Sequence, residues 1–448
     1  MKLKSIKLEN FKNIKSSKIE FKSNNLSAIY GPNGSGKTAI IEGLEVIKEY
    51  FLVDEPDFME ERLNEKLRNF MKIGETKTDI ELEIENETKK YKIIVSFKKD
   101  KLNSILPVKE EILYKNVDKK RETYKKLISF ENYENQEIKL KKSESIKIIE
   151  RILKKQEISQ RSINLKNARL NSYIGLIFNQ IIENQKNENK IDLNDELKNV
   201  MVQFLKLKDY LTKIFIITLE NQAMTNLKVF FNMNIHLENS QGTIPIIFDE
   251  NNNFYPEDIA EAIIKTIKQI NEIFKAIIPD SELICEVDGE RLNEKQKEKG
   301  INLYIMKKSD KISIKNESVG IKKIISILSA LVYCIQDKNA LVVIDELDAH
   351  IFEYLLAVIL EQISEIARGQ LIFTAHNLSP MERLKGENII ITSINDDEIN
   401  YNYFKRVSQT TNLRQKYIRS QMIWSEDNIN PLNISETEIA LYMRELIK

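Results

Sequence analysis

A short stretch near the start of the chain has the residue types and spacing that bind phosphate groups. It reads Tyr30-Gly31-Pro32-Asn33-Gly34-Ser35-Gly36-Lys37-Thr38 and fits the pattern G-x-x-x-x-G-K-[ST]. Its glycines allow backbone conformations in which successive N–H groups point at phosphate oxygens. Lys37 would reach the β- and γ-phosphates of a nucleotide, and the Thr38 hydroxyl would bind Mg²⁺. The stretch therefore predicts a nucleotide site.

The segments on either side of this loop have the pattern that such a site requires. Leu26–Tyr30 is predicted to be a short buried strand, and an apolar helix is predicted from Ala39 to about Phe51. The alternative is a glycine turn with a chance lysine. The order strand, glycine loop, helix favours phosphate binding, because the loop then lies at the positive end of the new helix.

A second motif supplies the carboxylates that a nucleotide site needs for its metal and its water. Leu341–Ile344 is an apolar run, predicted to be a buried strand of a parallel sheet, and Asp345 and Glu346 follow it. At the C-terminal edge of the strand, Asp345 would hold Mg²⁺ together with Thr38. Glu346 would polarise the attacking water. Strands often end in acidic residues, so the motif gains weight from its place downstream of the phosphate loop.

A third motif places a histidine after another buried strand. Leu371-Ile372-Phe373 leads to Thr374-Ala375-His376-Asn377. We expect His376 to lie beside the γ-phosphate as a charge sensor or a water-positioning group. A lone histidine is more often a core or surface residue, and we assign no role in the site to His236 and His350.

Upstream of these motifs, Glu317-Ser318-Val319-Gly320 opens an apolar helix. Ser318 has one simple interpretation as a helix cap. A serine and a glycine at a helix N-terminus also form an anion site, so Ser318 and Gly320 are candidates for binding phosphate.

This order of motifs resembles the ATP-binding-cassette (ABC) ATPase superfamily, in its SMC, RecF and OLD branch. Leu8-Glu9-Asn10-Phe11-Lys12-Asn13-Ile14 looks like the opening strand and turn of that branch, and Glu317–Gly320 looks like its signature motif. Asp345-Glu346, Leu347-Asp348 and His376 look like the Walker B motif, the D-loop and the switch histidine. Val319 stands where the signature usually has its first glycine. The resemblance implies hydrolysis of ATP with Mg²⁺, with Lys37, Glu346 and His376 as the catalytic residues.

Within the branch, the chain looks most like stand-alone bacterial ATPases of phage-defence and abortive-infection systems, such as the ATPase subunits of Septu and PARIS. The residues that carry this likeness are Phe373–Glu382 and Asn412-Leu413-Arg414-Gln415-Lys416-Tyr417. The resemblance implies a head-to-tail oligomer in which Ser318 and Gly320 of one copy cap the ATP of another. It also implies a separate effector protein, such as a nuclease.

The predicted elements give an α/β fold, a P-loop NTPase of the ABC head type with a mixed sheet and a helical insertion. Residues 1–115 are predicted to form an N-terminal ATPase lobe, and 229–410 a C-terminal lobe with the signature, Walker B and switch histidine. Between them, 116–228 has lost most of its glycine and is predicted to be a helical insertion. Residues 411–448 form a tail that holds the only tryptophan, Trp424.

The amino-acid composition excludes some classes of protein but does not identify a partner. The chain has 448 residues, and 68 Lys and Arg balance 68 Asp and Glu, so no global charge draws it to nucleic acid. Cys285 and Cys334 match no metal spacing, which favours a reducing cytoplasm. The longest apolar run, Ile324–Ile335, is shorter than a bilayer span, so we expect no membrane partner.

Three functions remain open from the sequence. The first is an anti-phage ATPase whose nucleotide state senses infection and controls an effector. The second is a RecF- or SMC-like ATPase that clamps DNA, for which Lys98, Lys99, Lys101, Lys119 and Lys120 are compatible basic residues. The third is a scaffold that binds ATP without hydrolysing it, against which Glu346 and His376 argue.

Overall fold

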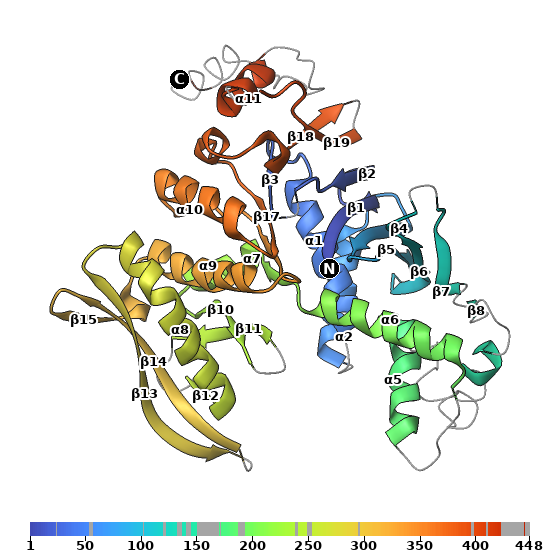
Figure 1. Ribbon diagram of the computed structural model, residues 1–448, viewed down its shortest axis with the longest axis horizontal. Coiled ribbons are helices and arrows are strands. Elements are labelled where there is room, and N and C mark those ends of the chain that lie inside the picture. Colours follow the sequence, from blue (N-terminus) through green and yellow to red (C-terminus); the bar gives the residue numbers. More distant parts are fainter. Residues whose placement is uncertain are drawn as a thin grey trace.

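The computed structural model describes residues 1–23, 25–52, 57–101, 103–119, 122–131, 137–139, 145–149, 170, 172–186, 193–237, 241–248, 253–293, 296–395, 398–408, 411–422 and 443. In this part of the chain, helices pack against and between four β-sheets (Figure 1). The predicted α/β class with a mixed sheet is confirmed. The largest parallel array of strands lies at the middle of the molecule and positions the motifs described above.

This central sheet has the strand order β19-β18-β3-β17-β16-β9. All neighbours are parallel except β18 and β19, which form an antiparallel hairpin. The strands are β3 (Leu26–Tyr30), β9 (Phe215–Ile217), β16 (Leu341–Ile344), β17 (Gln370–Thr374), β18 (Ile389–Asn395) and β19 (Glu398–Tyr403). Because β3, β16 and β17 are adjacent and parallel, the residues that follow them emerge at one edge of the sheet.

Both faces of the central sheet are buried, which is why its strands are apolar runs rather than alternating ones. In β16, Leu341 and Val343 join one hydrophobic core, whereas Val342 and Ile344 join a second core on the opposite face. The sheet therefore separates two cores, and the strand ends that carry the site motifs are held from both sides.

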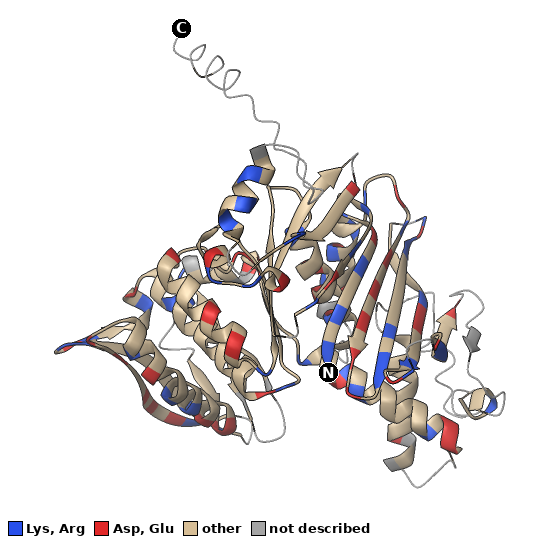
Figure 2. Cartoon of the chain, turned by 45° about the horizontal axis from the view of Figure 1, so that its top comes forward, with Lys and Arg blue, Asp and Glu red and all other residues tan. Residues whose placement is uncertain are grey.

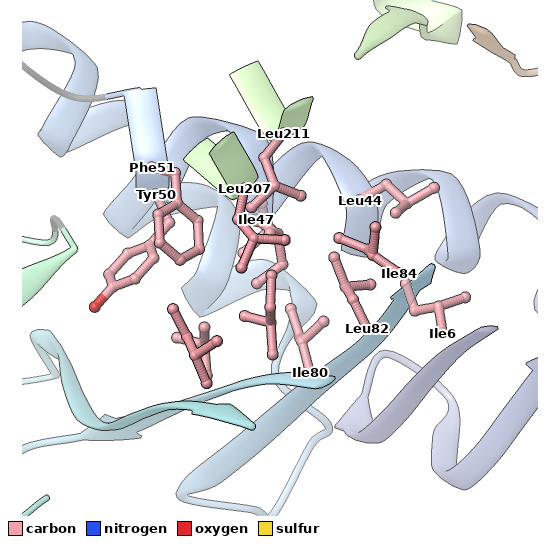
Figure 3. Packing of buried hydrophobic residues seen from close by; sticks show 14 of the residues in the cluster. Ile6, Leu44, Ile47, Tyr50, Phe51, Ile80, Leu82, Ile84, Leu207 and Leu211 are labelled. Carbon is pink, nitrogen blue, oxygen red and sulfur yellow. The ribbon is translucent and has the colours of Figure 1, made fainter. Parts of the chain in front are cut away.

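The first core lies under an antiparallel sheet with the order β2-β1-β4-β5-β6-β7-β8. Its strands are β1 (Lys2–Phe11), β2 (Ile14–Glu20), β4 (Lys77–Glu85), β5 (Lys89–Lys99), β6 (Ile105–Asn116), β7 (Lys125–Glu131) and β8 (Glu137–Lys139). Helix α1 (Lys37–Leu52) packs on the inner face of this sheet through Leu44, Ile47 and Tyr50 (Figure 3).

The outer face of the same sheet is covered with charge of alternating sign (Figure 2). Lys92 lies 2.7 Å from Glu81, Lys90 lies 2.9 Å from Glu83, and similar pairs continue onto the neighbouring strands. Positive and negative groups neutralise each other along the strands, so the described part of this face carries no continuous basic lane.

The segment 116–228 was predicted to be helical, and this prediction is wrong in part. Helices α5 (Tyr173–Lys186), α6 (Asp195–Thr212) and α7 (Leu219–Asn226) are present, but β7 and β8 extend the N-terminal sheet and β9 belongs to the central sheet. Phe215–Ile217 is buried on both faces, and such a short apolar run has no periodicity that separates a strand from a helix. Residues 150–169 of this predicted helical insertion lie outside the described residues.

Helix α2 (Asp57–Phe70) packs on α1 and joins the first core through Leu63 and Leu67. The second core is covered by the remaining elements of the chain. The strands are β10 (Phe230–His236), β11 (Gln241–Ile247), β12 (Phe254–Pro256), β13 (Ser281–Asn293), β14 (Gln296–Lys307) and β15 (Asp310–Ser313). The helices are α8 (Glu257–Ile277), α9 (Val319–Gln336), α10 (Glu353–Ile366) and α11 (Leu413–Met422). Trp424 and most of the predicted tail lie outside the described residues.

Helix α9 is longer than the apolar run expected from the sequence. Among the described helices it is the one long and apolar enough to cross a membrane by length and composition. However, 67% of it is buried within the protein, where it packs on α8 and β10. Its apolar character is that of a core helix, and the signature residues Glu317–Gly320 span its N-terminus.

Candidate functional site

A cleft lies at the carboxyl ends of the central parallel strands. Lys37 and Thr38 line it from the start of α1, Glu346 and Thr374 line it from the ends of β16 and β17, and His376 closes one side. Segments more than 300 residues apart in the chain, such as Thr38 and Asp345, meet here through a hydrogen bond of 3.3 Å. The structure thus brings together the phosphate loop, the Asp345-Glu346 pair and His376.

The phosphate loop has the backbone that its glycines permit. Gly34 and Gly36 have φ angles of +76° and +85°, in the left-handed region that favours glycine. Helix α1 begins at Lys37, so the unpaired N–H groups of its first turn face the cleft. Asn33, Gly34 and Gly36 line the cleft themselves, which leaves room for a phosphate against the backbone.

The hairpin of β18 and β19 supports the loop from behind, a feature that was not predicted from the sequence. Thr392 forms a hydrogen bond with Ser35, and the Tyr401 hydroxyl donates to the Gly36 carbonyl at 2.8 Å. A Cβ atom at Gly31 would lie 1.8 Å from Thr392 Oγ1, so this position accepts only glycine. The loop conformation therefore depends on residues near the other end of the chain.

Lys37 points along the inside of the loop. Its Nζ donates to the carbonyl oxygens of Gly31 at 2.8 Å and Pro32 at 3.0 Å. Burial lowers the pKa of Lys37, and the carboxylates of Asp345 and Glu346 oppose that shift. A nucleotide phosphate would give this buried ammonium a charged partner in place of the carbonyl oxygens.

Asp345 has the environment expected of a metal ligand. Its Oδ1 accepts hydrogen bonds from Thr38 and Thr374, whereas its Oδ2 is buried and has no hydrogen-bond partner among the residues that the structure describes. A buried carboxylate oxygen without a partner is costly unless a cation binds it. Mg²⁺ typically takes one or two protein ligands together with phosphate and water. Thr38 and Asp345 therefore fit Mg²⁺ bound with a nucleotide.

Glu346 and His376 face each other across the cleft. His376 Nε2 lies 4.0 Å from Glu346 Oε1, and both side chains are partly exposed. Glu346 has a φ of +45°, which is uncommon for a residue with a side chain, and its amide donates to Thr374 Oγ1 at 2.8 Å. This backbone turn aims the carboxylate into the cleft, where it can contact water beside a bound nucleotide.

Asp348 holds the segment that carries His376. Its Oδ2 accepts hydrogen bonds from the amides of His376 at 2.9 Å and Asn377 at 2.7 Å. The D-loop resemblance pointed to Leu347-Asp348, but this contact within one molecule was not predicted. It fixes the position of His376 relative to the turn that carries Glu346.

Lys12 and Asn13 also line the cleft, in the turn between β1 and β2. Asn13 Nδ2 donates to the Gly34 carbonyl at 2.5 Å, and Lys12 forms an ion pair with Glu42 at 2.6 Å. The sequence identified this segment only as a strand and a turn. The available signal was two polar side chains at a sharp turn, one strand before the strand that leads into the phosphate loop.

Ser318 and Gly320 are not among the described residues that line this cleft. Ser318 caps α9, because its Oγ accepts from the Ile321 amide at 3.3 Å. Gly320 approaches the backbone of His350 so closely that a Cβ atom would lie 2.7 Å from the His350 carbonyl oxygen. The structure therefore does not bring the signature residues to the cleft within one copy of the chain.

The comparisons with known proteins were made on the whole chain. The model of a family described as "AAA ATPase domain" matches residues 1–379. A protein named "Retron Vc95 probable ATPase", from Vibrio cholerae serotype O1 biovar El Tor, is 24% identical over 468 aligned positions, which cover 98% of this chain and 82% of that protein.

Solved structures of SMC heads are similar at low sequence identity. The SMC head domain from Thermotoga maritima is 14% identical, covers 90% of this chain and 100% of its own, and has a TM-score of 0.38. An Smc head domain with an extended coiled coil, bound to the C-terminal domain of ScpA derived from Pyrococcus furiosus, is 12% identical, covers 94% of this chain and 99% of its own, and has a TM-score of 0.42.

Proposed function

The chain belongs to the AAA ATPase domain family, and we propose that its ATPase works as a nucleotide-controlled switch in anti-phage defence. In this proposal, ATP binding and hydrolysis change the association of two or more copies, and this change holds or releases a partner effector. The observation that carries the enzymatic part is the cleft in which Lys37, Thr38, Asp345, Glu346 and His376 meet.

Each residue of the cleft has its own role in the reaction. The loop amides and Lys37 bind the phosphates, and the Asn13–Gly34 contact holds the open side of the loop. Glu346 polarises the attacking water, and His376 contacts the γ-phosphate side. Mg²⁺ bound to Thr38 and Asp345 would neutralise charge that develops on the phosphates. The products are ADP and phosphate.

We further propose that the site is completed by a second copy of the chain. Ser318 and Gly320 lie outside the cleft of their own copy, at the N-terminus of an 18-residue helix. A helix N-terminus attracts negative charge, so the start of α9 suits the γ-phosphate held by another copy. One copy alone would lack part of the charge stabilisation of the transition state and would hydrolyse ATP slowly.

The support for a defence role is the relative named as a retron ATPase, which aligns with almost the whole chain. The partner effector, a nuclease in our proposal, is inferred from the resemblance to defence ATPases. The free thiols of Cys285 and Cys334 are consistent with a cytoplasmic location. DNA clamping is the second candidate, and the neutralised outer face of the N-terminal sheet gives it little support (Figure 2).

Two variants test the ATPase and the switch. Glu346→Gln should bind ATP without hydrolysing it and should dimerise with ATP, as measured by light scattering after size exclusion. Lys37→Ala should lose hydrolysis and ATP-dependent dimerisation together. If Glu346→Gln stays monomeric with ATP and Lys37→Ala still releases phosphate, the site assignment fails.

The defence role needs its own experiment. Cells that carry this gene with its native neighbours should plate phage less efficiently than cells in which the gene encodes Lys37→Ala. Equal plating would refute the defence proposal. ATP-dependent duplex DNA binding that weakens with salt would support the clamp instead.

A further inference from the structure

The backbone of the Asp345-Glu346 turn is held from behind by two polar side chains, of which Lys323 is buried and Gln222 is partly buried. Lys323 Nζ donates to the Glu346 carbonyl at 2.7 Å. Gln222 Nε2 donates to the Asp345 carbonyl at 2.6 Å. Lys323 Nζ also donates to Gln222 Oε1 at 2.9 Å, so the two side chains form one connected network.

This network acts on a residue whose backbone is unusual. Glu346 has a φ of +45°, a conformation that residues with a side chain adopt rarely. Its amide is fixed by Thr374 Oγ1, and its carbonyl is fixed by Lys323 and by the Ala349 amide at 3.2 Å. Without Lys323, the Glu346 carbonyl would keep only the weaker hydrogen bond from Ala349 at 3.2 Å, so the peptide after Glu346 would be held less firmly.

The Lys323 side chain is costly to bury, which indicates that it has more than a packing role. Its residue is 6% exposed, and burial lowers its pKa to about 8, against the opposing effect of Asp348, Glu346 and Asp345. An ammonium group in such a place is retained where its hydrogen bonds serve a specific geometry.

The two side chains come from two different helices, and each helix is connected to a different part of the molecule. Lys323 lies on α9, one to two turns after the cap residue Ser318. Gln222 lies on α7, which follows β9, and Ile217 at the end of β9 pairs with Ile344 at the end of β16. A shift of either helix therefore pulls on the carbonyl groups of the turn that carries Glu346.

We propose that Lys323, with Gln222, is a positioning residue that sets the backbone conformation of Glu346 and ties it to the start of helix α9. This inference rests on the proposed function, in which Glu346 polarises the attacking water. Neither side chain needs to touch the nucleotide, since both act through the main chain of residues 345 and 346.

The neighbouring lysine offers a matched control. Lys322 is also buried on α9 and also donates to a carbonyl group, that of Lys315 at 2.9 Å. Its Nζ lies over the ring of Phe248 at 4.7 Å, and neither Lys315 nor Phe248 belongs to the Asp345-Glu346 turn. Replacing either lysine with methionine removes one buried ammonium from the same helix.

The experiment compares Lys323→Met, Lys322→Met and Gln222→Leu in the full-length protein. Lys323→Met should lower kcat by about tenfold or more and leave the Kd for a fluorescent ATP analogue within about twofold. Gln222→Leu should also lower kcat. In the double variant, the fold decrease in kcat should be smaller than the product of the two single decreases. Lys322→Met should keep kcat within about twofold, although its melting temperature falls.

Hydrogen exchange tests the positioning role of Lys323 independently of the ATPase activity. In Lys323→Met the amides of residues 346–349 should exchange faster than in Lys322→Met, whether or not the wild-type protein hydrolyses ATP. A wild-type protein without ATPase activity would refute the proposed function alone. The positioning inference is overturned if the two lysine variants lower kcat equally, if the Kd of Lys323→Met rises as much as its kcat falls, or if exchange at 346–349 does not change.

Discussion

The hydroxyl of Thr374 donates a hydrogen bond to Asp345 Oδ1 and thereby orients the carboxylate that we assign to Mg²⁺. The same hydroxyl accepts from the amide of Glu346, so one oxygen atom serves both acidic residues of the cleft. Thr374 is fully buried at the end of β17, which leaves its hydroxyl little freedom to move.

We therefore expect Thr374→Val to lower kcat/KM for ATP by about tenfold. Valine has the same shape, but it leaves the Glu346 amide without its acceptor and removes one of the two hydrogen bonds that Asp345 Oδ1 accepts. Thr374→Ser keeps the hydroxyl and should retain most of the activity. Phosphate release at saturating Mg²⁺ measures both variants, and equal loss in the two would point to packing rather than to the hydroxyl.

Tyr401→Phe should weaken ATP binding more than it slows hydrolysis. The variant removes the donor to the Gly36 carbonyl, and we expect the Kd to rise by about three- to tenfold. Tyr403→Phe is the control, because the Tyr403 hydroxyl on the same strand donates to Glu20, away from the loop. Titration with a fluorescent ATP analogue should show a change for Tyr401→Phe only.

Asp348→Ala should release the segment that carries His376. Two backbone amides lose their acceptor, and kcat should fall by about tenfold or more while ATP still binds to the phosphate loop. Asp337→Ala removes a similar cap, to the Asn339 amide, at the far end of α9 and should leave kcat unchanged. A comparable loss in both variants would contradict the assigned role.

Removal of Mg²⁺ should abolish hydrolysis without abolishing nucleotide binding. The loop amides and Lys37 bind phosphate without a metal. Asp345 Oδ2, in contrast, accepts no hydrogen bond from the described residues, so it depends on the metal for a cationic partner. Excess EDTA should stop phosphate release, and added Mg²⁺ should restore it. Asp345→Asn should not recover at any Mg²⁺ concentration, and its recovery would argue against the proposed ligand set.

Glu110 should make the folding stability depend on pH. It is fully buried beneath α1, and burial raises its pKa to about 7, against hydrogen bonds from Ser172, Ile174 and Tyr50. The folded state thus holds this proton more tightly than the unfolded chain, whose pKa is near 4.5. The stability from this group is complete below the unfolded pKa and is lost as pH rises through 7, by about 3 kcal/mol in all.

Glu110→Gln should remove this decline between pH 5 and 8 in urea unfolding. Glu111→Gln serves as the control on the adjacent position. Burial raises the pKa of Glu111, but hydrogen bonds from Lys109 and Lys126 outweigh it and lower the pKa overall. Its contribution is lost only as pH falls below the unfolded value, so Glu111→Gln should shift stability by the same amount at every pH tested. Parallel pH profiles for Glu110→Gln and wild type would contradict the prediction.

Much of the fold and of the candidate site could be predicted, because the motifs are local. The phosphate loop and the Asp345-Glu346 pair are each contiguous in sequence, and each follows a strand that its apolar residues reveal. The order of the strands in the central sheet was not predictable from such patterns. Neighbouring strands such as β3 and β17 come from opposite ends of the chain.

The supporting residues could not be predicted, since their partners are distant in sequence. Lys323 and Gln222 are 101 residues apart, and Tyr401 and Gly36 are 365 residues apart. Local sequence also does not distinguish Lys322 from Lys323, two consecutive lysines near the start of a helix. Only the packing of α9 shows which of them contacts the turn at Glu346.

The support of the phosphate loop by β18 and β19 has a consequence for synthesis of the protein. Gly31 and Gly36 are made early, whereas Thr392 and Tyr401, which fix their backbone, are made late. The loop of a nascent chain therefore lacks its native support until the hairpin has left the ribosome and paired with β3. ATP binding with native affinity therefore begins only after β18 and β19 have been translated, and translation products that stop before them should not bind ATP with that affinity.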